Sequence, residues 1–172
     1  MDSSSATRHM LKYASYHRDR RNIATHFIGI PLIVFAIGVL LGHVRLTLGD
    51  VGVSAAGLLW IISTIWYLAL GNLALGLAVS AANGLLFALG GPLGEGAQWL
   101  IWGSSSFAVG WVLQFVGHFH EGKKPAFVDD LVGLLVGPMF VVGEALFALG
   151  WGRTLQADIE RAVGPVVARR SR

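Results

Sequence analysis

The chain has 172 residues, of which 54% are hydrophobic and only 13% are charged. Soluble globular domains carry about 25% charged residues, so this composition excludes an ordinary soluble protein. Cysteine is absent, which excludes disulfide bonds, thiolate metal ligands and a cysteine nucleophile. The net charge of +3 comes from basic residues in the two terminal segments and one loop. This distribution suits anionic lipid headgroups better than nucleic acid.

Several apolar runs reach about 18 residues, which is long enough for a helix to cross a bilayer. We therefore predict that residues 1–172 form a single all-α integral membrane domain. Its predicted tails are a flexible segment over 1–12 and a basic segment over 152–172. The four predicted transmembrane helices cover 27–43, 51–70, the stretch from the Gly71-Asn72 turn to Gly90, and 97–117. Asn22 is predicted to cap the first helix, Asp50 to lie in a short loop, and 91–96 to form another loop.

A fifth apolar segment, 131–151, is either a further span or a re-entrant helical hairpin. Basic residues before the first span place the N-terminal side in the cytoplasm. A full fifth crossing would then put the basic C-terminal residues outside, against the same rule; these residues are Arg153, Arg161, Arg169, Arg170 and Arg172. A hairpin bent near Gly137-Pro138 removes the conflict and returns Glu144 toward the cytoplasmic face.

Four crossings also bring distant histidines to one membrane depth. His17 and His26 stand at the start of the first span, and His118 stands at the end of the fourth. His17 and His26 are nine residues apart, so on one straight helix they would face opposite ways. A turn between them would let them converge. Three imidazoles with nearby carboxylates can hold a ferrous ion or zinc.

Other polar residues near this layer have more than one interpretation. His120 is a further candidate ligand, and Glu121 is either a ligand or a residue that orients a ligating imidazole. Glu144 is a carboxylate within an apolar run, which is costly unless the group is functional or paired. Its alternative role is a salt bridge to Lys123, Lys124 or Arg153.

Two motifs resemble those of a known family, the fungal 2-hydroxy fatty acid dioxygenases and their bacterial relatives. The first motif is Tyr16-His17-x4-Asn22-x3-His26-x4-Pro31. The second runs Gly110-Trp111-x2-Gln114-Phe115-Val116-Gly117-His118, then Glu121 and Pro125-Ala126, and continues with Asp129 to Leu131, Pro138, Phe140 and Glu144. The resemblance covers about residues 13–150. One departure is that two residues, rather than the usual three, separate His118 from Glu121.

The resemblance implies a membrane enzyme that depends on Fe²⁺ and uses dioxygen to shorten a 2-hydroxy fatty acid by one carbon (α-oxidation). It matches His17, His26 and His118 to the histidines of the family, and Glu121 and Glu144 to its acidic positions. Basic side chains near the same layer are predicted to attract the substrate carboxylate; they are Arg20, Arg21, Lys123 and Lys124. The acyl tail would run between the first, fourth and fifth apolar segments.

Two other functions remain open at this level. One is a zinc-dependent membrane lipid hydrolase, and the other is a small membrane carrier or scaffold without enzymatic activity. The expected location is a bacterial inner membrane with the site facing the cytoplasm.

Overall fold

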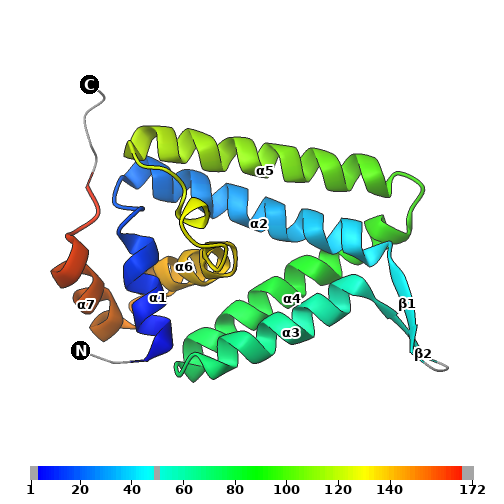
Figure 1. The fold of residues 1–172 in the computed structure, drawn as a ribbon, viewed down its shortest axis with the longest axis horizontal. Coiled ribbons are helices and arrows are strands. Elements are labelled where there is room, and N and C mark those ends of the chain that lie inside the picture. Colours follow the sequence, from blue (N-terminus) through cyan, green and yellow to red (C-terminus); the bar gives the residue numbers. More distant parts are fainter. Residues whose placement is uncertain (1–3, 49–50, 168–172) are drawn as a thin grey trace.

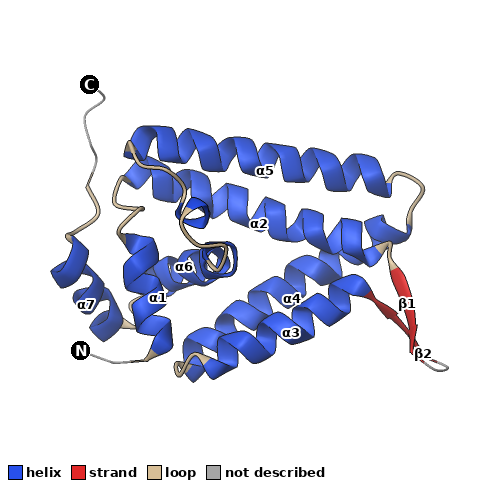
Figure 2. Cartoon of the chain, in the orientation of Figure 1, coloured by secondary structure: helices blue, strands red, loops and turns tan. Residues whose placement is uncertain are grey.

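The computed structural model describes residues 4–48 and 51–167. Within these ranges the chain is mostly helical, with one small β-hairpin (Figures 1 and 2). The elements are α1 (Ser5–Ala14), α2 (Arg20–Gly42), β1 (Arg45–Leu48), β2 (Val51–Ser54), α3 (Ala55–Ala69), α4 (Leu73–Glu95), α5 (Trp99–Glu121), the 3-10 helix η1 (Ala126–Val128), α6 (Gly133–Ala148) and α7 (Arg153–Val163). Asp50, Arg169, Arg170 and Arg172, on which the sequence prediction drew, lie outside the described residues.

Helices α2 and α5 lie side by side and form the longest contact in the molecule (Figure 1). Glycines allow this close approach. A Cβ atom added at Gly29 would lie 2.8 Å from the carbonyl oxygen of Gly110, and one added at Gly110 would lie 2.8 Å from the carbonyl oxygen of Gly29. The two backbones therefore touch where larger residues would hold them apart, as small residues allow between membrane helices. This contact brings the start of α2 next to the end of α5.

A helical hairpin, α3 and α4, packs against α2. Gly71, with φ of +85°, makes the turn between these helices, and Asn72 caps α4 by accepting a hydrogen bond from the backbone of Leu75 (3.1 Å). The antiparallel strands β1 and β2 lie at the end of the molecule away from α1 and α7 (Figure 1).

The main hydrophobic core lies at the end where α2 begins. There α1, α6 and α7 pack with the adjoining ends of α3 and α4. Its fully buried members include Met10, Tyr67, Met139, Phe140 and Ile159. The elements at this end therefore enclose the N-terminal turn of α2 and the loop before it.

Among the described residues, three helices are long and apolar enough to cross a membrane: α2, α4 and α5. The count becomes four if α6 and α7, which meet at 113°, are taken as one broken span. Helix α3 has 15 residues, or about 22 Å. It is shorter than the hydrocarbon core of about 30 Å. The predicted membrane character is thus supported, while four full spans plus a fifth are not.

Several predicted boundaries are wrong, each because a tertiary contact outweighs the local signal. Residues 5–12 belong to α1, whose Ala6 and Met10 are buried in the core, rather than to a flexible tail. Asp19, not Asn22, caps α2 by accepting a hydrogen bond from the backbone of Arg21. Helix α4 continues through the predicted loop 91–96 as far as Glu95, because Gly94 packs against the backbone of α2.

The fifth apolar segment does not bend at Gly137-Pro138, where α6 is continuous. The chain turns instead at residues 149–152, where Gly150 and Gly152 have positive φ, and returns as α7. Residues 153–163 of the predicted basic tail are therefore helical, and α7 packs on α1. Glycine tolerates this backbone conformation, which explains why the turn is here rather than at the proline.

Candidate metal centre

Three buried histidines meet at the end of the molecule where α2 begins. His17 comes from the turn between α1 and α2, His26 from the second turn of α2, and His118 from the last turn of α5. Each offers one ring nitrogen, and the three nitrogens lie within 4.8 Å of one another. The exposed fractions of the side chains are 0%, 1% and 6%. The structure therefore brings together three of the four histidines that the sequence analysis proposed as ligands, and His120 is not among them.

Backbone contacts orient two of these rings. The Nδ1–H of His17 donates to the carbonyl of Tyr13 (2.7 Å), and the Nδ1–H of His26 donates to the carbonyl of Asn22 (2.8 Å). This assignment leaves both Nε2 atoms as lone-pair acceptors, and they face each other at 3.0 Å. Two lone pairs repel at this distance unless a cation lies between them. Both nitrogens can lie at about 2.1 Å from one ion at this separation, so the residues fit a bound metal.

Burial keeps His17 in its neutral form. Loss of water, followed by the proximity of His26 and of His118, holds the pKa of His17 well below its ordinary value. A neutral imidazole is the form that binds a metal. Tyr13 stacks on the His17 ring with centroids 4.1 Å apart and fixes its plane.

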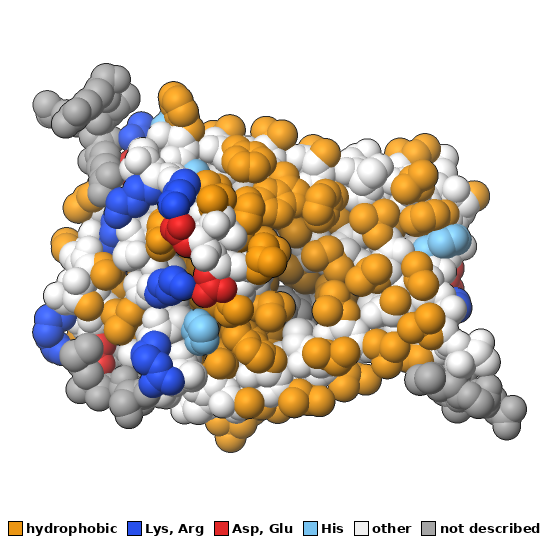
Figure 3. All heavy atoms as spheres, in the orientation of Figure 1, with side chains coloured by type: hydrophobic (Ala, Val, Ile, Leu, Met, Phe, Trp, Pro, Cys, Tyr) orange, Lys and Arg blue, Asp and Glu red, His pale blue; other side chains and the backbone are white. Residues whose placement is uncertain are grey.

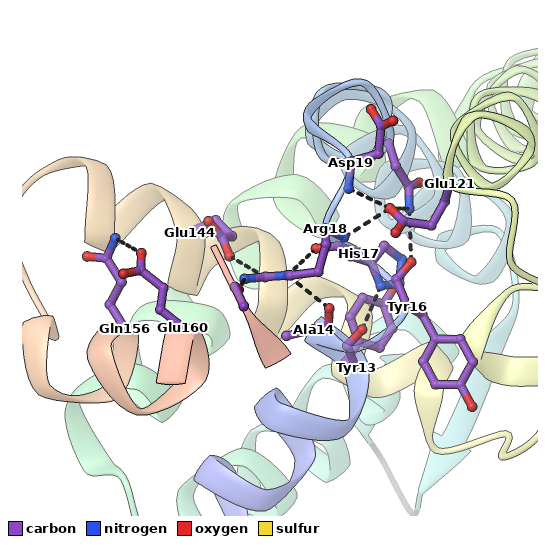
Figure 4. Close-up of polar contacts among 12 residues, drawn as sticks. Tyr13, Ala14, Tyr16, His17, Arg18, Asp19, Glu121, Glu144, Gln156 and Glu160 are labelled. Atoms are coloured by element: carbon purple, nitrogen blue, oxygen red, sulfur yellow. Dashed lines mark hydrogen bonds and ion pairs between the residues drawn. The ribbon is translucent and has the colours of Figure 1, made fainter. Parts of the chain in front are cut away.

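Glu121 anchors the turn that carries His17 (Figure 4). Its Oε2 accepts hydrogen bonds from the backbone of Arg18 (2.9 Å) and Asp19 (2.7 Å), and from the side-chain amide of Asn22 (3.2 Å). One carboxylate thereby ties the end of α5 to the start of α2. Its observed contacts favour the orienting role over that of a ligand. We call the hydrogen bonds from Arg18, Asp19 and Asn22 to this carboxylate the Glu121 clamp.

We expect Glu121→Ala to cost at least about 2 kcal/mol of stability, because three buried donors lose their acceptor. Metal affinity should fall about 10–100-fold, as when an outer partner of a metal ligand is lost. Thermal unfolding in detergent and metal titration measure the two effects. Glu95→Ala is the control, since Glu95 lies exposed at the opposite end and pairs with Arg45 at the surface. Equal metal affinity in both variants would contradict the clamp.

Gly117 sets the distance between α2 and α5 beside the histidines. A Cβ atom there would lie 2.2 Å from Oγ1 of Thr25 and 2.4 Å from Oδ1 of Asn22. We expect Gly117→Ala to destabilise the protein by about 1–3 kcal/mol through overpacking, and to weaken metal binding by separating His26 from His118. The control is Gly91→Ala, where an added Cβ meets no atom within 4 Å. Unchanged unfolding temperature and metal affinity in Gly117→Ala would contradict this account.

Arg18 is a buried residue that the sequence analysis did not single out. Its Nε donates to the carbonyls of Ala14 (3.0 Å) and His17 (2.8 Å), and its guanidinium lies 3.5 Å from Glu144 on α6 (Figure 4). Burial lowers the pKa of Arg18, while Glu144 opposes that shift. Glu144 does return to this end of the molecule, but its partner is Arg18 rather than Lys123, Lys124 or Arg153. The cost of an isolated carboxylate in an apolar run was the only signal for such a partner.

His120 lies outside the histidine group, because it is two residues after His118 and its ring contacts Phe119 instead. Three of the four cations predicted to attract a carboxylate have other partners. Arg21 pairs with Asp19 (3.1 Å), Lys124 pairs with Asp129 (2.5 Å), and Lys123 donates to the carbonyl of Ser15 (2.6 Å). Arg20 is exposed at the start of α2.

A largely apolar cavity of about 250 Å³ extends from the histidines between α2, α5 and α6. His26 and His118 line one part of it, and Ile37 and Phe107 line it about three helical turns further along their helices. The face shown in Figure 3 is hollowed near its middle, and hydrophobic side chains surround the hollow. A metal held by the histidines would therefore adjoin a space suited to an acyl chain.

Comparison with known proteins agrees with this arrangement. The family model described as 2-hydroxy-palmitic acid dioxygenase Mpo1-like matches residues 3–149. The chain is 33% identical over 152 residues to the 2-hydroxy-palmitic acid dioxygenase MPO1 of Saccharomyces cerevisiae, covering 86% of this chain and 83% of the yeast protein. The chain thus belongs to the Mpo1-like family, and the resemblance of its motifs is confirmed. No solved structure matches it.

Proposed function

We propose that the protein is an Fe²⁺-dependent membrane dioxygenase that shortens 2-hydroxy fatty acids by one carbon. The observation that carries the proposal is the buried group of three histidines at one end of an apolar cavity. The name of the yeast relative supports a hydroxy fatty acid as substrate. His17, His26 and His118 would hold the iron, which would supply activation of dioxygen and binding of the substrate oxygens. The residues around it would position the substrate and exclude water.

The cavity accounts for the tail of the substrate. A cavity of about 250 Å³ is below the usual range for sites that enclose a whole ligand, so it would hold only part of a 16-carbon chain. The remainder would lie along the membrane-facing side chains. The carboxylate would lie at the polar end, where Arg20 is exposed. Among the described residues, the other three cations predicted for it, Arg21, Lys123 and Lys124, already have partners. Glu121, Asn22 and Arg18 keep the histidine turn in place during binding.

The charge distribution supports a cytoplasmic site. Among the described residues, every Lys and Arg except Arg45 belongs to the end that holds the histidines. Because the chain has no cysteine, single cysteines report topology without background. A membrane-impermeant thiol reagent added to intact cells should label Thr47→Cys on β1 and spare Ala157→Cys on α7. The reverse pattern would place the site on the outer side.

Metal analysis together with oxygen uptake tests the function. Anaerobically purified protein loaded with Fe²⁺ should hold about one iron per chain and consume dioxygen only when 2-hydroxypalmitate is present. Mass spectrometry should detect the fatty acid shortened by one carbon. Zinc in place of iron with no oxygen consumed would indicate a hydrolase, and folded protein that binds no metal would refute the proposal.

A further inference from the structure

Gln114 is a buried polar residue to which neither the sequence prediction nor the proposed metal site gives a role. It lies on α5 one turn before His118, on the same face of the helix, and lines the cavity. Its side chain is only 5% exposed, and its Nε2 has no hydrogen-bond partner within the described structure. A buried polar group without a partner costs about 1–3 kcal/mol, so a polar ligand group beside Gln114 is favoured over an apolar one.

The location of the amide suits a particular part of the substrate. Gln114 lies about 6 Å along the helix axis from His118, on the side toward the interior of the cavity. Its Nε2 packs against Gly29, where an added Cβ would lie 2.3 Å away. Because Nε2 is fully buried while Gln114 lines the cavity, we take Oε1 to be the polar atom that a ligand in the cavity would meet. A fatty acid with its carboxylate at the histidines would carry its first tail carbons past this point.

We propose that Gln114 binds the 2-hydroxyl group and thereby distinguishes 2-hydroxy fatty acids from unsubstituted ones; this inference rests on the proposed function. A hydroxyl both donates and accepts, so it pairs with whichever amide atom faces the cavity. An unsubstituted acid would place a methylene there, expel water and leave the amide oxygen without a partner. Sites built around a buried polar group reject analogues that lack the matching group.

Tyr13 provides the comparison within the same cavity. Apart from the two histidines, the polar side-chain groups of the lining belong to Tyr13, Gln114 and the indole N–H of Trp111. The hydroxyl of Tyr13 is on the opposite wall, where a Cβ added at Gly137 of α6 would lie 3.2 Å from it. Replacing each residue in turn therefore shows which wall recognises the substrate hydroxyl.

The test is equilibrium binding of radiolabelled 2-hydroxypalmitate and palmitate to the metal-free protein in detergent, which separates Gln114 from any effect of iron. Wild-type protein should prefer the hydroxy acid about tenfold. Gln114→Leu and Gln114→Met should bind both acids about equally, mainly because the hydroxy acid binds less tightly. Palmitate binding by these variants shows that they are folded.

Val34→Ala is the matched control, because Val34 lines the cavity with an apolar side chain. This variant should bind both acids less tightly and leave the ratio of their affinities near ten. The proposal is overturned if the Gln114 variants keep the wild-type ratio, if the metal-free wild type shows no preference, or if Tyr13→Phe alone removes it. These binding results do not bear on the dioxygenase proposal, which stands as long as the iron-loaded wild-type protein still consumes oxygen with 2-hydroxypalmitate. Loss of oxygen uptake in the wild type would refute that proposal instead.

Discussion

Replacing His17, His26 or His118 by alanine is expected to abolish stable metal binding and reduce oxygen uptake by more than 100-fold. The expected loss exceeds the 10–100-fold effect of removing an outer-shell partner, because a direct ligand is removed. The three variants should fold in the metal-free state, since each change removes one of several lone pairs that face one another. Metal content after anaerobic loading, oxygen uptake and unfolding temperature measure these effects.

Two other histidines serve as controls. His120 lies outside the group, and His43 stacks on Trp99 at the start of α5, the end of that helix away from His118. Alanine at either position should leave metal content and oxygen uptake within about twofold of the wild type, since surface changes away from a site have small effects. If His120→Ala lost its metal while His118→Ala retained it, the assignment of ligands would be wrong.

Glu144→Leu is expected to destabilise the protein by about 3–5 kcal/mol, because it leaves the buried guanidinium of Arg18 without its counter-charge. The double variant Arg18→Met with Glu144→Leu should lose much less than the sum of the single changes, since no buried charge remains. Thermal and denaturant unfolding in detergent give these values. Oxygen uptake should fall in the double variant as well, because Arg18 also holds the carbonyl of His17.

Lys12 and Asp130 form the control pair. Their side chains are 54% and 37% exposed, and a pair at this exposure contributes about 0–1 kcal/mol. Asp130→Asn should therefore change stability by no more than that. Additive losses in the Arg18 and Glu144 double variant would mean that the two groups do not interact.

The gathering of His17, His26 and His118 could be predicted because successive apolar helices run in opposite directions, which brings the start of α2 and the end of α5 to the same end of the molecule (Figure 1). Their mutual orientation could not, since it rests on contacts to the carbonyls of Tyr13 and Asn22. The same limit applies to the start of α2, where Asn22 had the local features of a cap. The side-chain amide of Asn22 donates a hydrogen bond to Glu121, and Asp19 caps the helix instead.

Arg18 was missed for a related reason. Within the run Arg18-Asp19-Arg20-Arg21 its charge indicated a membrane surface. In the structure, Val167 donates a backbone hydrogen bond to the carbonyl of Arg18 (2.9 Å), and the guanidinium donates to the carbonyl of Gly164 (3.2 Å). Burial of this arginine therefore depends on residues about 150 positions away, which no local pattern contains.

The two sides of the α2–α5 contact are separated in sequence by α3 and α4, and this has a consequence for biogenesis. His17 and His26 enter the membrane region first, and His118 becomes available only after α3, α4 and α5 have been synthesised and inserted. Until then the first two histidines lack the third nitrogen and the clamp provided by Glu121. A metal held by the three histidines would consequently be loaded late in maturation, and a chain arrested before α5 would reach the bilayer without a complete set of these histidines.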